Sequence, residues 1–291
     1  MTNLINNQGI PFTKMEGLGN DYIYINDLAE NLSNLADLAV EMSERHYGIG
    51  SDGIIVLRPS SIADFKMRMF NLDGSEGKMC GNGIRCLAKF IYDQHLWSDK
   101  HLTIETLSGV KQVELIFNQS GQVTGARVNM GQPILENSLI PVQTKEANWL
   151  QHPFTLENTT YQVTAVSMGN PHLVIFHPKI SQLDLQSLGP KFEHHECFPE
   201  QINTEFAEII HSDEINMRVW ERGSGETLAC GTGACAVAVA SILNGFTDNT
   251  VTVNLLGGSL IITWDTSTSG DVYMEGPACT RFSGSYYPNT H

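Results

Sequence analysis

Two short stretches decide how this chain is organised: MCGNGIRC at Met79–Cys86 and ACGTGACA at Ala229–Ala236. Each places a cysteine directly before a Gly-X-Gly turn, and the leading cysteines, Cys80 and Cys230, stand 150 positions apart. One such turn is a weak signal. Two of them prompt a search for an internal repeat, because a fixed spacing is typical of duplicated structural units.

The same offset aligns further blocks of the chain without a gap. At this offset MRMFN (67–71) aligns with MRVWE (217–221), and Glu76 aligns with Glu226. GNDYIYI (19–25) likewise aligns with GNPHLVI (169–175). Downstream the register slips by one residue, where TIETLSG (103–109) resembles TVNLLGG (252–258). We therefore predict two homologous domains, residues 1–129 and 130–276, with the tail 277–291 packing back on the first.

Length and charge narrow the class of ligand. A chain of 291 residues is long enough for two domains with cores of their own. Its 17 Lys and Arg against 32 Asp and Glu give a net charge of −15, which disfavours nucleic acid and anionic membranes as partners. We expect a small-molecule ligand instead.

The chain ends and the cysteines indicate the compartment. The N-terminus lacks the apolar core of a signal peptide and no apolar run is as long as a membrane span, so the prediction is a soluble cytoplasmic protein. The six cysteines should then be reduced thiols, and no C-x-x-C pair indicates a zinc site. EHHECF (193–198) fits no metal-binding spacing, so we predict no metal. About ten residues at the N-terminus precede all of the repeated motifs and are expected to be disordered.

Hydrophobic patterning predicts an α+β fold. The apolar positions after Cys80 have helical spacing, and the run ACAVAVASIL (234–243) is apolar on every face until Asn244-Gly245 provides a stop. A helix that is apolar all round must be buried, so each domain should wrap its strands around a central helix. The predicted strands are short β-rich runs: YIYIN (22–26), GIIVL (53–57), FKMRMF (65–70), HLVIF (172–176), EINMRVW (214–220), VTVNL (251–255) and SLIITW (259–264).

The Cys-Gly-X-Gly turns combine an anion site with a thiol. Glycine permits tight backbone angles, and a helix start offers unpaired N–H groups with about half a positive charge. A cysteine in this field should have a pKa below its free value of about 8.5. Two such thiols on opposite sides of one carbon could remove a proton from one face and return a proton to the other. The pattern therefore predicts racemisation or epimerisation next to a carboxylate, chemistry that requires no pyridoxal phosphate.

Nearly the whole chain resembles the diaminopimelate epimerases, which are cofactor-independent enzymes with two active cysteines. The resemblance lies in KMEGLGNDYIYI, RHYGIGSDG, MFNLDGSEGKMCGNGIRC, VSMGNPHLV, FPEQINTEF, RVWERGSGETLACGTGACA and LLGGSL. It implies conversion of LL-2,6-diaminopimelate to the meso form, a step toward lysine and peptidoglycan precursors. It also implies two similar β-rich domains with the active site in the cleft between them, a homodimer, and no cofactor.

The resemblance also implies a set of site residues. Cys80 and Cys230 would be the acid–base pair, and His172 and Glu221 would adjust the pKa values of the cysteines. Substrate would be bound by backbone amides of the two turns and by polar side chains: Asn20, Asn71, Gly81, Asn82, Asn170, Asn203, Glu221, Arg222, Gly231 and Thr232. Cys86, Cys235 and Cys279 are interpreted as inert core residues.

One position departs from the family pattern, and two other functions stay open. Some members have glutamine where this chain has Gly53, so a side-chain contact cannot be carried over there. A racemase of a smaller amino acid such as proline or hydroxyproline would share the fold and the cysteine pair. A thiol switch, in which Cys80 and Cys230 form a regulatory disulfide, is the non-enzymatic alternative.

Overall fold

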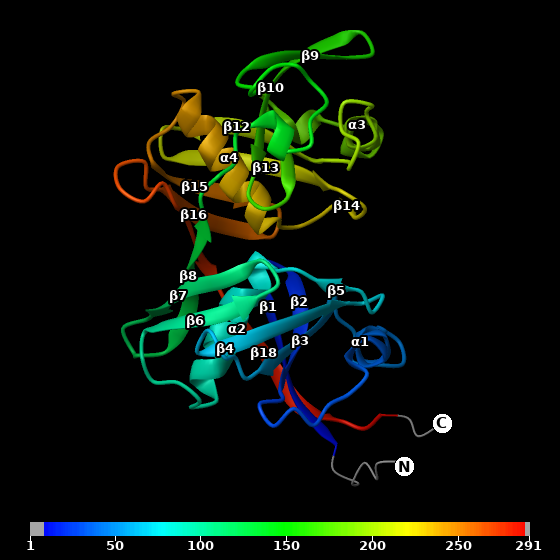
Figure 1. Ribbon diagram of the computed structural model, residues 1–291, viewed down its shortest axis with the longest axis vertical. Helices are drawn as coiled ribbons and strands as arrows, with labels where there is room; N and C mark the ends of the chain where they lie inside the picture. Colours follow the sequence, from blue (N-terminus) through cyan, green and yellow to red (C-terminus); the bar gives the residue numbers. More distant parts are fainter. Residues whose placement is uncertain (1–8, 289–291) are drawn as a thin grey trace. The chain divides into compact units, whose positions relative to one another are not determined.

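The computed structural model describes residues 9–288, and the chain divides into two compact units. Unit 1 comprises Met1–Arg127 and Pro277–His291, and unit 2 comprises Val128–Gly276. In Figure 1 unit 1 carries the blue, cyan and red ribbon and unit 2 the green to orange ribbon. Most of the N-terminal stretch that the sequence predicts to be disordered lies outside the described residues.

Unit 1 is built around one ladder of strands. Strand β1 pairs with both β18 and β2 in antiparallel fashion, β2 with β3 in parallel, β3 with β4 in antiparallel, β4 with β6 in parallel and β6 with β7 in antiparallel. The short β5 pairs with the end of β4. The elements are β1 Ile10–Gly17, β2 Asn20–Asn26, α1 Leu35–Ser43, β3 Gly53–Arg58, β4 Phe65–Asn71, β5 Glu76–Gly77, α2 Gly81–Asp93, β6 His101–Thr106, β7 Gly109–Phe117 and β18 Cys279–Tyr286, with β8 Val123–Gly131 leading out of the unit.

Unit 2 repeats the same series of pairings. Strand β10 pairs with β9 and β11 in antiparallel fashion, β11 with β12 in parallel, β12 with β13 in antiparallel, β13 with β15 in parallel and β15 with β16 in antiparallel, followed by β17. The elements are β9 His152–Leu156, β10 Thr159–Ser167, β11 Pro171–Phe176, α3 Leu185–Glu193, β12 Asn203–His211, β13 Glu214–Glu221, β14 Gly225–Glu226, α4 Gly231–Leu243, β15 Thr250–Leu255, β16 Gly258–Trp264 and β17 Val272–Pro277, with short 3-10 turns η1 Asn137–Leu139 and η2 Ile180–Gln182.

The predicted repeat and fold class are confirmed. Helices α2 and α4 are both 13 residues long and begin 150 positions apart, and the one-residue slip recurs between β7 and β16. Each unit also carries a bidentate ion pair at matching positions. Arg68 contacts Glu76 at 2.8 and 2.9 Å, and Arg218 contacts Glu226 at 2.7 and 3.1 Å. The chain is therefore an α+β protein of two duplicated, strand-rich units.

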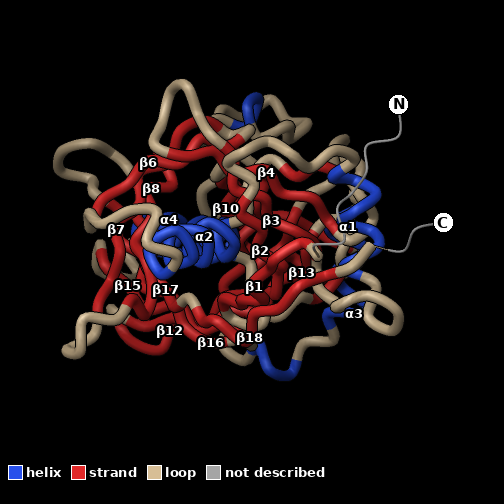
Figure 2. Tube along the Cα trace, turned by 90° about the horizontal axis from the view of Figure 1, so that it is seen from below, coloured by secondary structure: helices blue, strands red, loops and turns tan. Residues whose placement is uncertain are grey.

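Each unit encloses its central helix. Helix α2 packs against β1, β2, β3 and β7, and helix α4 packs against β10 to β13, β15 and β16. Side chains 234–240 of α4 are completely buried, as a helix that is apolar on every face requires. The predicted stop is confirmed, because Asn244 is the C-cap residue and Gly245 follows with φ 70°. Figure 2 shows the two helices in blue among the strands that make up most of the trace. None of the helices within residues 9–288 has the length and apolar character needed to cross a bilayer.

Candidate active site

Helix α2 begins directly after Cys80, which is its N-cap residue and has an extended backbone (φ −129°, ψ 121°). Its Sγ atom accepts a hydrogen bond from the N–H of Gly83 at 3.3 Å, as a serine oxygen does at many helix starts. The same thiol donates to Oδ1 of Asn20 at 3.2 Å. The N–H groups of Gly81 and Asn82 belong to the first turn, where the helix provides no acceptor for them. An anion and a partly exposed thiol can therefore meet at this turn.

Helix α4 begins in the same way after Cys230. This residue is also extended (φ −119°, ψ 109°), and its Sγ accepts from the N–H of Gly233 at 3.4 Å. The hydroxyl of Thr232 lies 3.6 Å from the sulfur. Cys230 is more buried than Cys80, with 5% of its surface exposed. The structure thus builds one local arrangement twice, a cysteine capping the central helix of each unit.

The glycines of the two turns are required by space and not by backbone angle. None of the turn glycines has a positive φ, so the expectation of unusual backbone angles at these positions is wrong. A Cβ atom at Gly83 would lie 2.5 Å from Cδ1 of Ile55, and one at Gly233 would lie 2.8 Å from Oε1 of Glu205. Both distances are shorter than real Cβ contacts. Ile55 and Glu205 occupy the same position in the two repeats, directly beneath the turn.

The environment of Cys230 contradicts one sequence prediction. Burial raises the pKa of this thiol well above its usual value, and the carboxylates of Glu221 and Glu205 raise it further. The Thr232 hydroxyl and the N–H of Gly233 act in the opposite direction but are outweighed. The expectation that the helix start lowers the pKa of both thiols is therefore wrong for Cys230, because removal from water disfavours the thiolate more than the helix field favours it.

A chain of buried polar groups leads to Cys230 within unit 2. His172 and Glu205 are both fully buried, with Nδ1 of His172 2.6 Å from Oε1 of Glu205. Nε2 of His172 lies 3.1 Å from Oδ1 of Asn170, whose Nδ2 donates to Oγ1 of Thr232 at 3.2 Å. Because Oδ1 of an amide can only accept, Nε2 carries a proton, and a further proton lies in the short contact with Glu205. A chain of hydrogen bonds through Asn170 and Thr232 therefore links His172 to Cys230.

Glu205 is a residue of this site that the sequence reasoning missed. Burial raises its pKa, and the neighbouring His172 opposes the shift. Its second oxygen, Oε2, has no hydrogen-bond partner within residues 9–288. The available signal was a single acidic residue inside the otherwise uncharged run INTEFA, a segment that none of the predicted strands includes. A buried carboxylate of this kind adjusts the charge next to the turn of α4.

Three further predicted residues lie together where β12 begins and β13 ends. Asn203 is buried, donates from Nδ2 to the carbonyl of Pro171 at 2.9 Å and accepts from the N–H of Arg222 at 2.9 Å. The Arg222 guanidinium donates to the carbonyl of Glu200 at 2.9 Å in an exposed contact. Glu221 accepts from the hydroxyl of Thr227. Asn203 therefore braces the loop from which Glu221 and Arg222 project.

The predicted asparagines of unit 1 play different local roles. Asn71 ends β4, and its Nδ2 donates to Oγ of Ser75 at 3.0 Å. Asn82 is 3% exposed and its Oδ1 accepts from Arg85 at 2.9 Å, so its side chain is engaged inside the helix. Only the backbone N–H of Asn82 is then left for a ligand, as the resemblance implies.

Gly53 is fixed by the pairing of β3 with β4. It lies opposite Asn71, and a Cβ atom there would be 2.1 Å from the carbonyl oxygen of Phe70. This backbone therefore has no room for the glutamine that some family members carry. We expect Gly53→Ala to lower the free energy of unfolding by about 1–3 kcal/mol, because β4 must move to admit the methyl group. Urea unfolding measures the loss, with the exposed Ser61→Ala as control. Equal stability of the two variants would contradict this reading.

No cluster of three or more potential metal ligands occurs in the described part of the chain. EHHECF, for which no metal was predicted, instead spans the end of α3, where Glu193 is buried. Its carboxylate accepts from Nε1 of Trp220 at 2.7 Å and from the N–H of Gly223 at 2.8 Å. Glu193 therefore braces the loop that carries Glu221 and Arg222 from the other side.

Comparison with known proteins identifies the family of this chain. The sequence model of the family described as Diaminopimelate epimerase matches residues 12–136 and 164–280. A protein from Desulfovibrio desulfuricans named diaminopimelate epimerase is 53% identical over 95% of this chain and 98% of its own length. Proteins of the same name from Acetivibrio thermocellus and Methanococcus maripaludis are 50% and 48% identical over 94% of this chain and 97% and 98% of theirs.

Solved structures share the fold at low sequence identity. A phenazine biosynthesis protein of the PhzF family from Bacillus anthracis has a TM-score of 0.66 at 16% identity, covering 97% of this chain and 100% of that chain. A probable proline racemase from Agrobacterium radiobacter has a TM-score of 0.67 at 13% identity, covering 96% and 93%. These likenesses show the architecture alone, whereas the matched family model spans most of the sequence. The chain therefore belongs to the diaminopimelate epimerase family.

Proposed function

We propose that the chain is an isomerase that converts LL-2,6-diaminopimelate to meso-diaminopimelate without a cofactor. The observation that carries the proposal is the duplicated helix start, in which Cys80 and Cys230 each cap the central helix of a homologous unit. Membership of the family and the names of relatives at 47–53% identity support the substrate. The reaction is a cytoplasmic step toward lysine and peptidoglycan precursors.

The proposed mechanism uses the two sulfurs on opposite faces of one α-carbon. A thiolate removes the α-proton, and the electrons of the C–H bond move into the substrate carboxylate as it becomes enolate-like. The N–H groups of Gly81 and Asn82 and of Gly231 and Thr232 stabilise that charge. The other cysteine, as a thiol, gives its proton to the carbon from the opposite face. The cysteines exchange protonation states, and proton exchange with water restores them.

Substrate recognition is assigned to the polar groups around the turns. Arg222 suits a carboxylate because its planar guanidinium can donate two parallel hydrogen bonds. Glu221 suits an ammonium group, and the amides of Asn20, Asn71 and Asn170 can both donate and accept. His172 and Glu221 are assigned to adjust the cysteines. The buried surroundings of Cys230 favour its thiol form, which suits a proton donor.

Proton exchange in D2O tests the proposal. Reduced protein is mixed with LL-diaminopimelate, and the α-hydrogen is followed by NMR, with L-proline as the comparison substrate. We expect deuterium at one α-centre together with meso product. Exchange with proline alone would support a racemase, and silence on both from folded protein with free thiols would leave the thiol switch. Neither alternative is favoured by the relatives named above, which carry the name diaminopimelate epimerase.

Arg222 provides a test of substrate recognition. Its side chain is held by a single exposed hydrogen bond, so Arg222→Ala should leave the fold intact. We expect KM for diaminopimelate to rise by about tenfold or more with a smaller change in kcat, because the contact is made in substrate and transition state alike. Steady-state kinetics measure the change. Lys191→Ala, which removes an exposed cation paired with Glu157 in the same unit, is the control. An unchanged KM would remove Arg222 from the recognition set.

A homodimer is proposed through strand β18. Six consecutive side chains of this strand are exposed, and Phe282 presents 51% of its surface. An exposed edge strand can pair with a strand of another chain. Sedimentation of the wild type against Phe282→Glu measures the assembly, and a monomeric wild type would refute it.

A further inference from the structure

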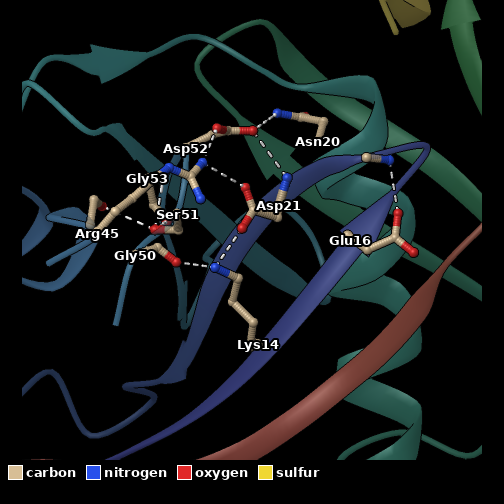
Figure 3. A network of polar contacts seen from close by, with 11 residues as sticks. Lys14, Glu16, Asn20, Asp21, Arg45, Gly50, Ser51, Asp52 and Gly53 are labelled. Atoms are coloured by element: carbon tan, nitrogen blue, oxygen red, sulfur yellow. Dashed lines mark hydrogen bonds and ion pairs between the residues drawn. The ribbon is translucent and has the colours of Figure 1, made fainter. Parts of the chain in front are cut away.

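Asp52 lies at the centre of a polar network in unit 1, shown in Figure 3. Its Oδ2 accepts from Nδ2 of Asn20 at 2.7 Å and from the N–H of Asp21 at 3.1 Å. Its Oδ1 accepts from the guanidinium of Arg45 at 3.1 Å. Asn20 also contacts Cys80, at 3.2 Å from Oδ1 to Sγ. Asp52 is thus separated from the cysteine by one side-chain amide.

A side-chain amide has two different ends, and its neighbours decide which end faces which way. An ionised carboxylate can only accept hydrogen bonds. Because Asp52 contacts Asn20, the NH2 end of that amide has to point to Asp52. The oxygen end is then the end that faces Cys80.

The orientation of this amide affects the charge on the sulfur. With its oxygen toward Cys80, Asn20 accepts a hydrogen bond from a thiol and stabilises the neutral form. With the amide reversed, Nδ2 would donate to a thiolate and stabilise the charged form. The two orientations therefore act on Cys80 in opposite directions.

Asp52 is itself held firmly. Arg45 bridges Asp52 and Asp21, lying 3.4 Å from Oδ1 of the latter, and Lys14 contacts Asp21 at 2.5 Å from the other side. Unit 2 has no carboxylate at the matching position, because the buried Ile202 occupies the place in the repeat that corresponds to Asp52. The network is therefore a property of the Cys80 side and was not copied in both repeats.

We propose that Asp52 is a positioning residue that orients the Asn20 amide with its oxygen toward Cys80, so that the free enzyme favours the thiol form of this cysteine. The start of helix α2 favours the thiolate form of Cys80. The Asn20 amide opposes this effect because its oxygen favours the thiol form. The inference rests on the proposed function only in taking Cys80 as a reacting thiol. Asp52 acts on the sulfur through Asn20.

Other groups around Cys80 keep a constant charge near neutral pH. Tyr22, from β2, lies next to Asn20 and Cys80, and burial raises its pKa well above 10. Burial likewise raises the pKa of Tyr24 on the same strand, and that of Cys86 on α2 to about 12. Arg85 on α2 stays charged. A titration seen between about pH 6 and 9 therefore reports Cys80 itself.

Alkylation without substrate tests the proposal. Folded protein is treated with iodoacetamide across that pH range, quenched and digested with trypsin, which releases Met79–Arg85 with Cys80 as its one cysteine. In Asp52→Ala the carboxylate that holds the Asn20 NH2 is gone, so the Asn20 amide is free to turn its NH2 toward Cys80. We expect the apparent pKa of Cys80 to fall by about one unit, a tenfold gain in thiolate where the thiol predominates. In Asp52→Asn the new amide oxygen can still accept from the N–H of Asp21 and from Asn20, so this variant removes the charge but keeps the amide orientation, and its shift should be smaller. Asp52→Ser, whose side chain is too short to reach Asn20, replaces the alanine variant if that one fails to fold.

A double-mutant cycle separates orientation from charge. In an Asn20→Ala background, Asp52→Ala should leave the alkylation profile unchanged, because the group that transmits the effect is absent. A shift that persists there would show that Asp52 acts as a bare negative charge and would overturn the proposal. No shift in the single variant Asp52→Ala would overturn it as well. The readout needs no diaminopimelate, so it stays independent of the D2O exchange that tests the proposed function.

Discussion

Alanine at either Cys80 or Cys230 is expected to reduce kcat for epimerisation by about 10²–10⁴-fold or more. Each substitution removes the only group assigned to one face of the substrate carbon. The two losses should not add, because removing one proton carrier already stops the inversion, so the double variant should be no slower than either single one. Coupled detection of meso-diaminopimelate measures the rate.

Serine provides a matched control at the same positions. In the wild type Sγ of each cysteine accepts from a backbone N–H of the first helical turn, at 3.3 Å for Cys80 and 3.4 Å for Cys230. Alanine loses this cap, at a cost of about 1 kcal/mol, whereas serine restores it. Serine variants should therefore be as stable as the wild type and still inactive in epimerisation, because a hydroxyl is a far weaker acid than a thiol.

A second cysteine of the same helix tests the assignment. Burial raises the pKa of Cys86 to about 12, so this residue stays a neutral thiol. Cys86→Ala should keep its turnover while losing some stability from the cavity. Near wild-type turnover in Cys80→Ala, or complete loss in well-folded Cys86→Ala, would mean that the wrong cysteine is assigned.

Arg85→Met should lower the free energy of unfolding by about 2–5 kcal/mol. Arg85 has no exposed surface, and its guanidinium donates to the carbonyl of Gly81 at 3.1 Å, to Oδ1 of Asn82 at 2.9 Å and to the carbonyl of Pro277 at 3.2 Å. The thioether fills similar space but donates nothing, so three acceptors lose a charged donor. The turn that carries Cys80 should loosen first.

Urea unfolding followed by circular dichroism measures the total effect, and hydrogen exchange of the α2 amides locates it. Arg68→Met is the matched control, because it breaks a bidentate pair with Glu76 in which both side chains are about one-third exposed. Exposed ion pairs contribute only about 0–1 kcal/mol. Equal losses in the two variants would show that burial of Arg85 adds nothing.

The repeat and the two central helices could be predicted because their signals are local. Helical spacing after Cys80, the wholly apolar run after Cys230 and the alternation in the predicted strands each require only neighbouring residues. All seven predicted strands are confirmed by β2, β3, β4, β11, β13, β15 and β16. Helix α1 was also within reach, since Leu35, Leu38, Ala39 and Met42 have helical spacing and are buried.

The features that the sequence did not predict correctly depend on interactions between distant segments of the chain. Helix α3 contains Pro190 directly after Gly189, a pair that indicates a break, and tertiary packing against β12, β13 and β14 overrides it. The pKa of Cys230 was mispredicted because the helix field follows from the local sequence, whereas burial does not. Glu205 could be joined to His172 only once β11 and β12 were known to pair in parallel with His172 opposite Asn203.

The pairing of β1 with β18 has a consequence for how the protein is made. Thr13 and Ser283 share a hydrogen bond across 270 positions of sequence, so the strand that completes unit 1 is synthesised only after the whole of unit 2. Unit 2 is continuous and can close while synthesis proceeds, but unit 1 waits for its final partner with the edge of β1 uncovered. A nascent chain stalled before residue 277 should therefore contain a finished second unit and an unfinished first one, so a native Cys80 turn has to wait for the synthesis of β18.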